Sequence, residues 1–132
     1  MTAQSNTTLQ DRFIDFSVQI INLSEQLPPT KAGLHISGQI LRSGTSPAPN
    51  YAEAQSAESV DDFIHKMKIA LKELRETEVW LKVIQRANLV KSNETTSPIL
   101  QENNELISIL VASVNTARRN KANKNNSPNS SS

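Results

Sequence analysis

Two histidines, His35 and His65, are the residues of this chain best suited to binding a metal or transferring protons. Asp62 precedes His65 by three residues, and this spacing approaches the Glu-x-x-His pair of helical di-iron proteins. A di-metal site needs two such pairs and two further glutamates, and the chain has no second pair. The absence of cysteine excludes thiolate ligands and a cysteine nucleophile. We therefore expect no metal and no cofactor.

Serine is abundant and could act as a nucleophile. However, the chain contains no Gly-x-Ser-x-Gly turn, and no histidine and acid can be assigned to a particular serine. It also has no glycine-rich loop of the type that binds phosphate groups. Four central serines are better explained as helix-packing or capping residues: Ser43, Ser46, Ser56 and Ser59. We predict that the protein is not an enzyme.

The segment from Arg42 to Glu53 carries polar side chains among small ones. Arg42, Asn50 and Glu53 lie in it, and Glu73 follows twenty residues later. We expect a structural hydrogen-bond network in which Glu53 or Glu73 accepts from Arg42, while Asn50 ties a bend to the next helix. The alternative is a contact with a ligand or RNA. Burial of an unpaired charge is costly, which favours the paired structural network.

Basic side chains are the second set that could bind a partner. The net charge is +1, but four bases and no acid follow Ala117, whereas ten bases and thirteen acids precede it. The body is therefore mildly acidic and the tail is basic, which is a modest signal for nucleic acid. The candidate nucleic-acid contacts come from one central segment and from the tail: Lys66, Lys68, Lys72, Arg75, Arg118, Arg119, Lys121 and Lys124.

Helices must position these side chains, because apolar residues recur at steps of three and four along most of the chain. The first helix is predicted to begin after Thr8, with Asp11 at capping-box spacing, and to stop at Pro28. Its apolar residues share one face: Leu9, Phe13, Phe16, Ile20, Leu23 and Leu27. Ile14 and Ile21 widen this stripe beyond a single seam.

The second helix is predicted to begin after Thr30 and to be bent. Three glycines lower its helix propensity by roughly 1 kcal/mol each relative to alanine, and Pro47 and Pro49 remove two backbone donors. We expect a break or bend between Gly44 and Pro49, with the helix resuming over residues 50–57. Its apolar contacts are assigned to Leu34, Ile36, Ile40 and Leu41.

The third helix is predicted to begin after Ser59, with Asp62 again at capping-box spacing, and to end near Ala87 and Asn88. Its buried face is expected to contain Phe63, Met67, Ala70, Leu74, Thr77, Leu81 and Ile84, with Ile64 and Leu71 beside them.

The fourth helix is predicted to have Ser97 as its N-cap and Pro98 at its first position. Its buried stripe is expected to contain Leu100, Ile107, Leu110, Val114 and Ala117, flanked by Leu106 and Val111.

These elements indicate an all-α protein, an antiparallel up-and-down four-helix bundle over residues 8–119. Residues 1–7 and 120–132 are polar and lack apolar periodicity, so we expect both ends to be disordered. The longest apolar run, from Ile109 to Ala112, is far shorter than the roughly 20 residues that span a membrane. The N-terminus has no basic start and no apolar run. We therefore expect a cytoplasmic protein without a membrane partner.

The segment from Ile40 to Trp80 carries a distinctive series of motifs. In order and spacing they are Arg42-Ser43, Thr45-Ser46, Asn50-Tyr51-Ala52-Glu53-Ala54, Asp62-Phe63-Ile64, Lys66, Ile69-Ala70-Leu71-Lys72-Glu73, Glu76-Thr77 and Trp80. This pattern resembles the ribosomal-RNA intervening-sequence proteins, which are small bacterial four-helix bundles. The resemblance extends from about Phe13 to Ala117. It implies a four-helix bundle that assembles as a homopentamer, in a family without an established enzymatic activity.

Two functions are compatible with these observations. The first is a non-catalytic homo-oligomeric scaffold, because the wide apolar stripes of the first and third helices leave area for a neighbouring subunit. The alternative is an RNA- or DNA-binding accessory protein, since the resemblance implies a relation to inserts in large-subunit ribosomal RNA genes. A pentamer would bring together about twenty positive charges from five tails, a far stronger field than that of one subunit.

Overall fold

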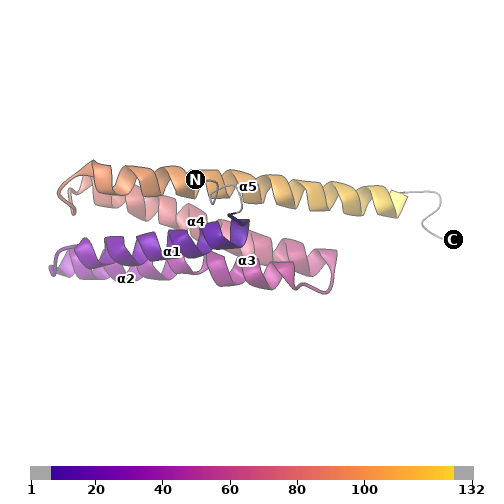
Figure 1. Ribbon diagram of the computed structural model, residues 1–132, viewed down its shortest axis with the longest axis horizontal. Helices are drawn as coiled ribbons and strands as arrows, with labels where there is room; N and C mark the ends of the chain where they lie inside the picture. Colours follow the sequence, from indigo (N-terminus) through magenta and orange to yellow (C-terminus); the bar gives the residue numbers. More distant parts are fainter. Residues whose placement is uncertain (1–6, 127–132) are drawn as a thin grey trace.

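Five helical segments make up residues 7–126, the part of the chain that the computed structural model describes. They are α1 (Leu9–Gln26), α2 (Lys31–Thr45), α3 (Pro47–Gln55), α4 (Val60–Arg86) and α5 (Asn93–Asn126). α2 and α3 together form the second helix of an antiparallel four-helix bundle (Figure 1). The predicted all-α fold is confirmed. The predicted disorder of residues 1–6 and 127–132 lies outside the described residues.

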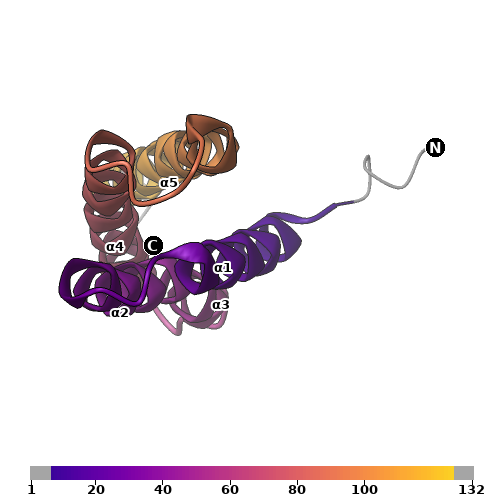
Figure 2. The ribbon, with the colours of Figure 1, turned by 90° about the vertical axis from the view of Figure 1, so that its left-hand side faces the viewer.

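The bundle has two layers. α1, α2 and α3 lie in one layer, and the hairpin of α4 and α5 covers it (Figure 2). α4 packs on α2, α3 and α5, and α1 packs on the same three helices. α5 continues well past the N-terminal end of α1, so its C-terminal half pairs chiefly with α4 (Figure 1).

Side-chain caps fix three of the helix starts where the sequence predicts them. The Thr8 hydroxyl accepts a hydrogen bond from the Asp11 amide at 3.0 Å, and the Asp11 carboxylate accepts from the Thr8 amide at 3.4 Å. The Ser59 hydroxyl accepts from the Asp62 amide at 3.0 Å, and Thr30 caps α2 in the same way. Each cap satisfies an amide that has no partner inside its helix.

The predicted bend in the second helix lies at Ser46. α2 ends at Thr45 and α3 begins at Pro47, which is earlier than the predicted restart at Asn50. Proline is well suited to the first position of a helix, where its missing N–H would have no partner in any case. Gly44 lets α1 approach just before the bend, because a Cβ there would lie 2.7 Å from Ile20 side-chain atoms.

The last helix differs from its prediction at its start. α5 begins at Asn93, before the predicted cap Ser97, and Pro98 therefore lies inside the helix. The Ser92 hydroxyl accepts from the Glu94 amide at 3.0 Å and starts the helix early. A proline this close to the start removes a single backbone hydrogen bond, which the neighbouring turns tolerate.

The prediction of disorder from residue 120 is wrong for residues 120–126, which are helical. This stretch contains neither glycine nor proline, so nothing in it terminates α5. Lys121 also forms an ion pair with Asp61 of α4, which ties the last turns of α5 to its neighbour.

The core combines the predicted faces of α1 and α4 with a face of α5 that overlaps the predicted one in part. Five of the six residues assigned to α1 are buried, and so are Met67, Ala70, Leu74, Thr77, Leu81 and Ile84 of α4. In α5 the buried positions are Thr96, Ile99, Asn103, Leu106, Leu110 and Val114. Leu110 and Val114 are buried as predicted, but Leu100 and Ile107 are only partly buried, so the N-terminal half of the predicted stripe is turned by about one position. Within residues 7–126, no helix has the length and apolar character needed to cross a membrane.

Candidate interaction surfaces

The predicted polar network is present in part, at the contact between α2 and α4. The Arg42 guanidinium donates to the Glu73 carboxylate at 3.0 Å and also pairs with Glu76. Trp80 donates its indole N–H to Glu76 at 3.1 Å. The Arg42 side chain is 52% exposed, so this network lies on the surface of the α2–α4 contact. Its role is to hold two helices together.

The other two residues assigned to the network have different partners. Glu53 accepts from the Lys66 ammonium at 2.7 Å, and this hydrogen bond raises the pKa of Lys66 above its usual value. Asn50 donates to the carbonyl oxygen of Ser46 at 3.0 Å, within the bend itself. Of the two predicted acceptors for Arg42, Glu73 is therefore the one that pairs with it, and the predicted tie from Asn50 to the next helix is wrong. Glu53 and Asn50 instead bind residues that lie nearer to them, Lys66 and Ser46 respectively.

The candidate nucleic-acid contacts fall into two groups. Lys68, Lys72 and Arg75 are exposed on α4, whereas Lys66 is half-buried beside Glu53. The tail bases are all exposed on the last turns of α5: Arg118, Arg119, Lys121 and Lys124. Arg119 donates to Thr116 at 3.3 Å, and Lys121 is engaged by Asp61. The structure therefore keeps both groups accessible but places them on different helices.

The histidines lie on different helices. His35 of α2 contacts the Trp80 ring edge-on at a centroid distance of 6.2 Å, and His65 is exposed on α4. Among residues 7–126, no three His, Asp or Glu side chains gather as a metal site would require. His35 therefore packs against Trp80.

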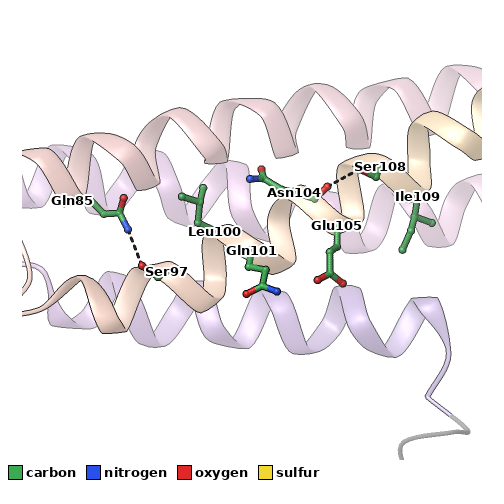
Figure 3. Close-up of a pocket in the computed structure, with 8 residues that line it drawn as sticks. All are labelled: Gln85, Ser97, Leu100, Gln101, Asn104, Glu105, Ser108 and Ile109. Atoms are coloured by element: carbon green, nitrogen blue, oxygen red, sulfur yellow. Dashed lines mark hydrogen bonds between the residues drawn. The ribbon is translucent and has the colours of Figure 1, made fainter.

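A surface groove of about 710 Å³ runs along α5 (Figure 3). Leu100 and Ile109 supply its apolar lining, and the Gln85 amide of α4 donates to Ser97 at one end. Its one titratable side chain, Glu105, accepts from Arg12 of α1 at 3.0 Å. The groove therefore contains no nucleophile paired with a base.

Arg12 forms an ion pair that sequence reasoning missed. Its guanidinium binds both oxygens of Glu102 on α5, at 2.6 and 2.9 Å, as well as Glu105. The hydrogen bond that Arg12 donates to Glu102 raises the pKa of Arg12 above its usual value. Bidentate pairs of this kind fix geometry as well as adding energy. The partners lie ninety residues apart in sequence, so no local spacing indicates the contact.

Five large apolar side chains on one side of the α1–α2 hairpin face solvent, and we call this set the outer patch. Its members are Ile14, Val18, Ile21, Leu34 and Leu41. The first three lie opposite the buried face of α1 and are between 42% and 48% exposed. Leu34 and Leu41, predicted with Ile36 and Ile40 to supply the apolar contacts of the second helix, are exposed, whereas Ile36 and Ile40 are buried.

The two parts of the outer patch adjoin each other. Ser37 of α2 donates to the Ser24 carbonyl of α1 at 3.2 Å, and Gly44 contacts Ile20. This antiparallel register brings Leu41 to the level of Ile21, with both side chains pointing outward. The outer patch is therefore one apolar surface shared by two helices.

Comparison with known proteins identifies the family of this chain. Residues 6–112 match the model of the family described as 23S rRNA-intervening sequence protein. The chain belongs to this family. A search of curated proteins finds no match.

A crystal structure similar to this intervening-sequence protein is that of a protein of unknown function from the S23 ribosomal protein family of Bacteroides thetaiotaomicron VPI-5482. The two sequences are 37% identical, and the TM-score is 0.75. The match covers 81% of this chain and 98% of the other. The bundle is thus shared over nearly the whole length of that structure.

The motifs that carry the resemblance to intervening-sequence proteins gather where α2 meets α4. Arg42 pairs with Glu73 and Glu76 there, and the Ser43 and Thr77 hydroxyls lie 2.8 Å apart in the buried contact. Small hydroxyl side chains let two helices approach closely while satisfying each other. In this intervening-sequence protein these members of the motif series therefore form a helix-packing contact.

Proposed function

We propose that this intervening-sequence protein is a non-catalytic subunit of a homo-oligomeric scaffold, with a pentamer as its assembly. The observation that supports this proposal is the outer patch, where five large apolar side chains adjoin on one surface. A contiguous apolar surface of this kind marks an interaction site. Burying it against another copy would remove these side chains from water, at roughly 25 cal/mol per Å² of apolar area.

The pentamer is the assembly that resemblance to the intervening-sequence proteins implies. A cytoplasmic scaffold needs no catalytic side chains, which agrees with the groove on α5 having its one titratable residue occupied by Arg12. The four-helix bundle provides the rigid unit, and its surface residues select the neighbouring subunit.

Val18→Asp tests the role of the outer patch. Val18 is 48% exposed in the single chain, so the substitution should leave the bundle folded. In an assembly it would bury an unpaired carboxylate, which we expect to raise the dissociation constant by about tenfold or more, at about 1.4 kcal/mol per factor of ten. Size exclusion coupled to light scattering measures the shift.

Val60→Asp is the matched control, because Val60 is 46% exposed but lies at the start of α4, outside the outer patch. The dissociation constant of the Val60→Asp assembly should equal that of the unmodified chain. Equal dissociation constants for both variants would contradict a role of the outer patch in association.

A second function, nucleic-acid binding, is favoured by the exposed bases at the end of α5. Arg118 and Lys124 form no salt bridge with any residue between 7 and 126, so their charge is available to phosphate groups. We propose RNA or DNA as the alternative partner, with Lys68, Lys72 and Arg75 of α4 as further contacts. The chain shows no base-reading motif, so phosphate contacts would dominate.

The triple substitution Arg118→Gln, Arg119→Gln and Lys124→Gln tests this alternative and spares the Lys121 ion pair with α4. It should weaken binding to ribosomal RNA fragments and to unrelated RNA alike. The slope of log affinity against log salt should fall by roughly 2 to 3, because each phosphate contact contributes about 0.7 to 0.9. Filter binding over a salt series measures both quantities, and an unchanged slope would rule out these three contacts.

A further inference from the structure

The outward face of α1 has apolar residues in its middle and acids at its ends. Asp11, Ile14, Val18, Ile21 and Glu25 recur at steps of three and four, and all are exposed. We call these five residues and the adjacent Asp15, which is also exposed, the α1 stripe. At 1.5 Å per residue the stripe is about 21 Å long.

The outward face of α4 has the opposite charge, with bases on both sides of one apolar residue. We call it the α4 stripe, and its residues also recur at steps of three and four: Lys68, Lys72, Arg75, Val79, Lys82 and Arg86. All six are exposed, and Val79 at 57% is more exposed than any residue of the α1 stripe's apolar centre. The α4 stripe is about 27 Å long.

A surface hollow lies at the apolar part of the α4 stripe. Its volume is about 460 Å³, and Val79, Val83 and Ala87 line it together with Lys82 and Arg86. The hollow therefore has an apolar floor with basic side chains at its rim. An apolar side chain flanked by acids fits such a hollow, and the α1 stripe carries three of them.

Most charges of both stripes lack a partner within their own chain. Among the residues described, Asp15 and Glu25 form no salt bridge, and neither do Lys68, Lys72, Arg75 or Arg86. Lys82 pairs with Glu78 of its own helix. Unpaired charges of opposite sign on two elongated faces favour association between those faces.

The two stripes cannot meet within one subunit. α1 and α4 are the diagonal helices of the bundle, since each packs on α2, α3 and α5 and their backbones do not approach each other (Figure 2). Their outward faces therefore look away from each other at opposite corners. A second copy of the chain is the partner that carries the complementary stripe.

We propose that subunits associate head to tail, with the α1 stripe of one copy against the α4 stripe of the next. This inference rests on the proposed homo-oligomeric function and names its interface. Pairing like faces is disfavoured, because α1 against α1 opposes acid to acid and α4 against α4 opposes base to base. A head-to-tail interface uses two different surfaces and closes into a ring when its rotation permits.

Reversing the charge of one stripe should abolish association. The acid-reversed variant carries Asp15→Lys and Glu25→Lys, and the base-reversed variant carries Lys68→Glu and Arg75→Glu. Asp11 is left in place because its carboxylate accepts from the Thr8 amide in the capping box of α1. By light scattering, each variant alone should have the mass of one chain, 14.6 kDa, at concentrations where the unmodified chain is oligomeric.

Combining the reversals should restore association in two ways. A chain with all four substitutions should regain the mass of the unmodified protein, because every interface again joins opposite charges. An equimolar mixture of the two singly reversed variants should also associate into heterodimers and longer alternating species, since the α1 stripe of each variant then faces an α4 stripe of opposite sign on the other. A closed ring of five cannot alternate two variants throughout, so the mixture should not restore the pentamer mass. An α1-to-α1 interface would instead leave the base-reversed variant, whose α1 stripe is unchanged, as oligomeric as the unmodified chain, which would overturn the proposal.

Arg118→Glu with Arg119→Glu is the control, because it changes the net charge as much as the base reversal does but on α5. It should leave the mass unchanged, and circular dichroism should show equal helix content in all variants. A monomeric unmodified chain would contradict the proposed function itself. An oligomeric unmodified chain whose reversed variants remain oligomeric, or whose fourfold variant stays monomeric, would contradict only the head-to-tail interface.

Discussion

Leu74→Ala should lower the free energy of unfolding by roughly 2–5 kcal/mol, as truncation of a buried leucine does. Leu74 is fully buried in the middle of α4 and belongs to the core that all helices share. The neighbouring Asn103 amide donates to the Leu74 carbonyl at 3.0 Å and limits collapse of the helices into the cavity. We therefore expect a loss in the upper half of this range, measured by urea titration at a fixed protein concentration.

His65→Ala is the control for Leu74→Ala on the same helix. His65 is exposed, so its truncation should change the free energy of unfolding by less than about 0.5 kcal/mol. Similar losses for the two variants would mean that α4 presents a different face to the core.

Gly33→Ala should destabilise the protein by about 2–3 kcal/mol, although alanine favours helix formation. A Cβ at Gly33 would lie 2.0 Å from the carbonyl oxygen of Pro28, so the chain between α1 and α2 would have to move. A backbone atom cannot change rotamer to relieve such a clash. The same urea titration measures the loss.

Gly38→Ala is the matched control in the same helix. A Cβ at Gly38 meets nothing within 4 Å, so the substitution should stabilise the protein by about 0.5–1 kcal/mol through helix propensity alone. The changes in the free energy of unfolding should therefore have opposite signs for the two substitutions. Stabilisation by both substitutions would contradict the close approach of Pro28 to α2.

The sequence predicts the parts of this fold that depend on local chemistry. Caps at Thr8 and Ser59 need only residues three positions apart, and the bend at Ser46 follows from the neighbouring Pro47. The face of α4 is predicted correctly because its core residues are nearly all apolar. In each case the deciding interactions lie within one or two turns of helix.

The buried face of α5 could not be predicted in the same way, because it contains Thr96 and Asn103. Asn103 donates to the backbone of α4, a bond that no local pattern reveals. Apolar periodicity alone therefore selects the flanking Leu100 and Ile107 as the buried residues. The rule that buried positions are apolar fails where a side chain finds a partner on another helix.

The candidate interaction surfaces were predictable to a similar extent. Ile14 and Ile21 stand out in the sequence as apolar residues beyond the core stripe, and they are exposed. Leu34 and Leu41 could not be separated from the buried Ile36 and Ile40, because the sequence does not specify on which side α1 will pack. Glu53 is paired with Lys66 for the same reason: the packing of α3 against α4 decides its partner.

The central claim is that this intervening-sequence protein functions as a homo-oligomer, and sedimentation equilibrium on the unmodified chain tests it most directly. Measured over a range of micromolar concentrations, the mass should be a whole-number multiple of 14.6 kDa, and five times that value if the assembly is the pentamer. A mass of 14.6 kDa throughout that range would contradict the account.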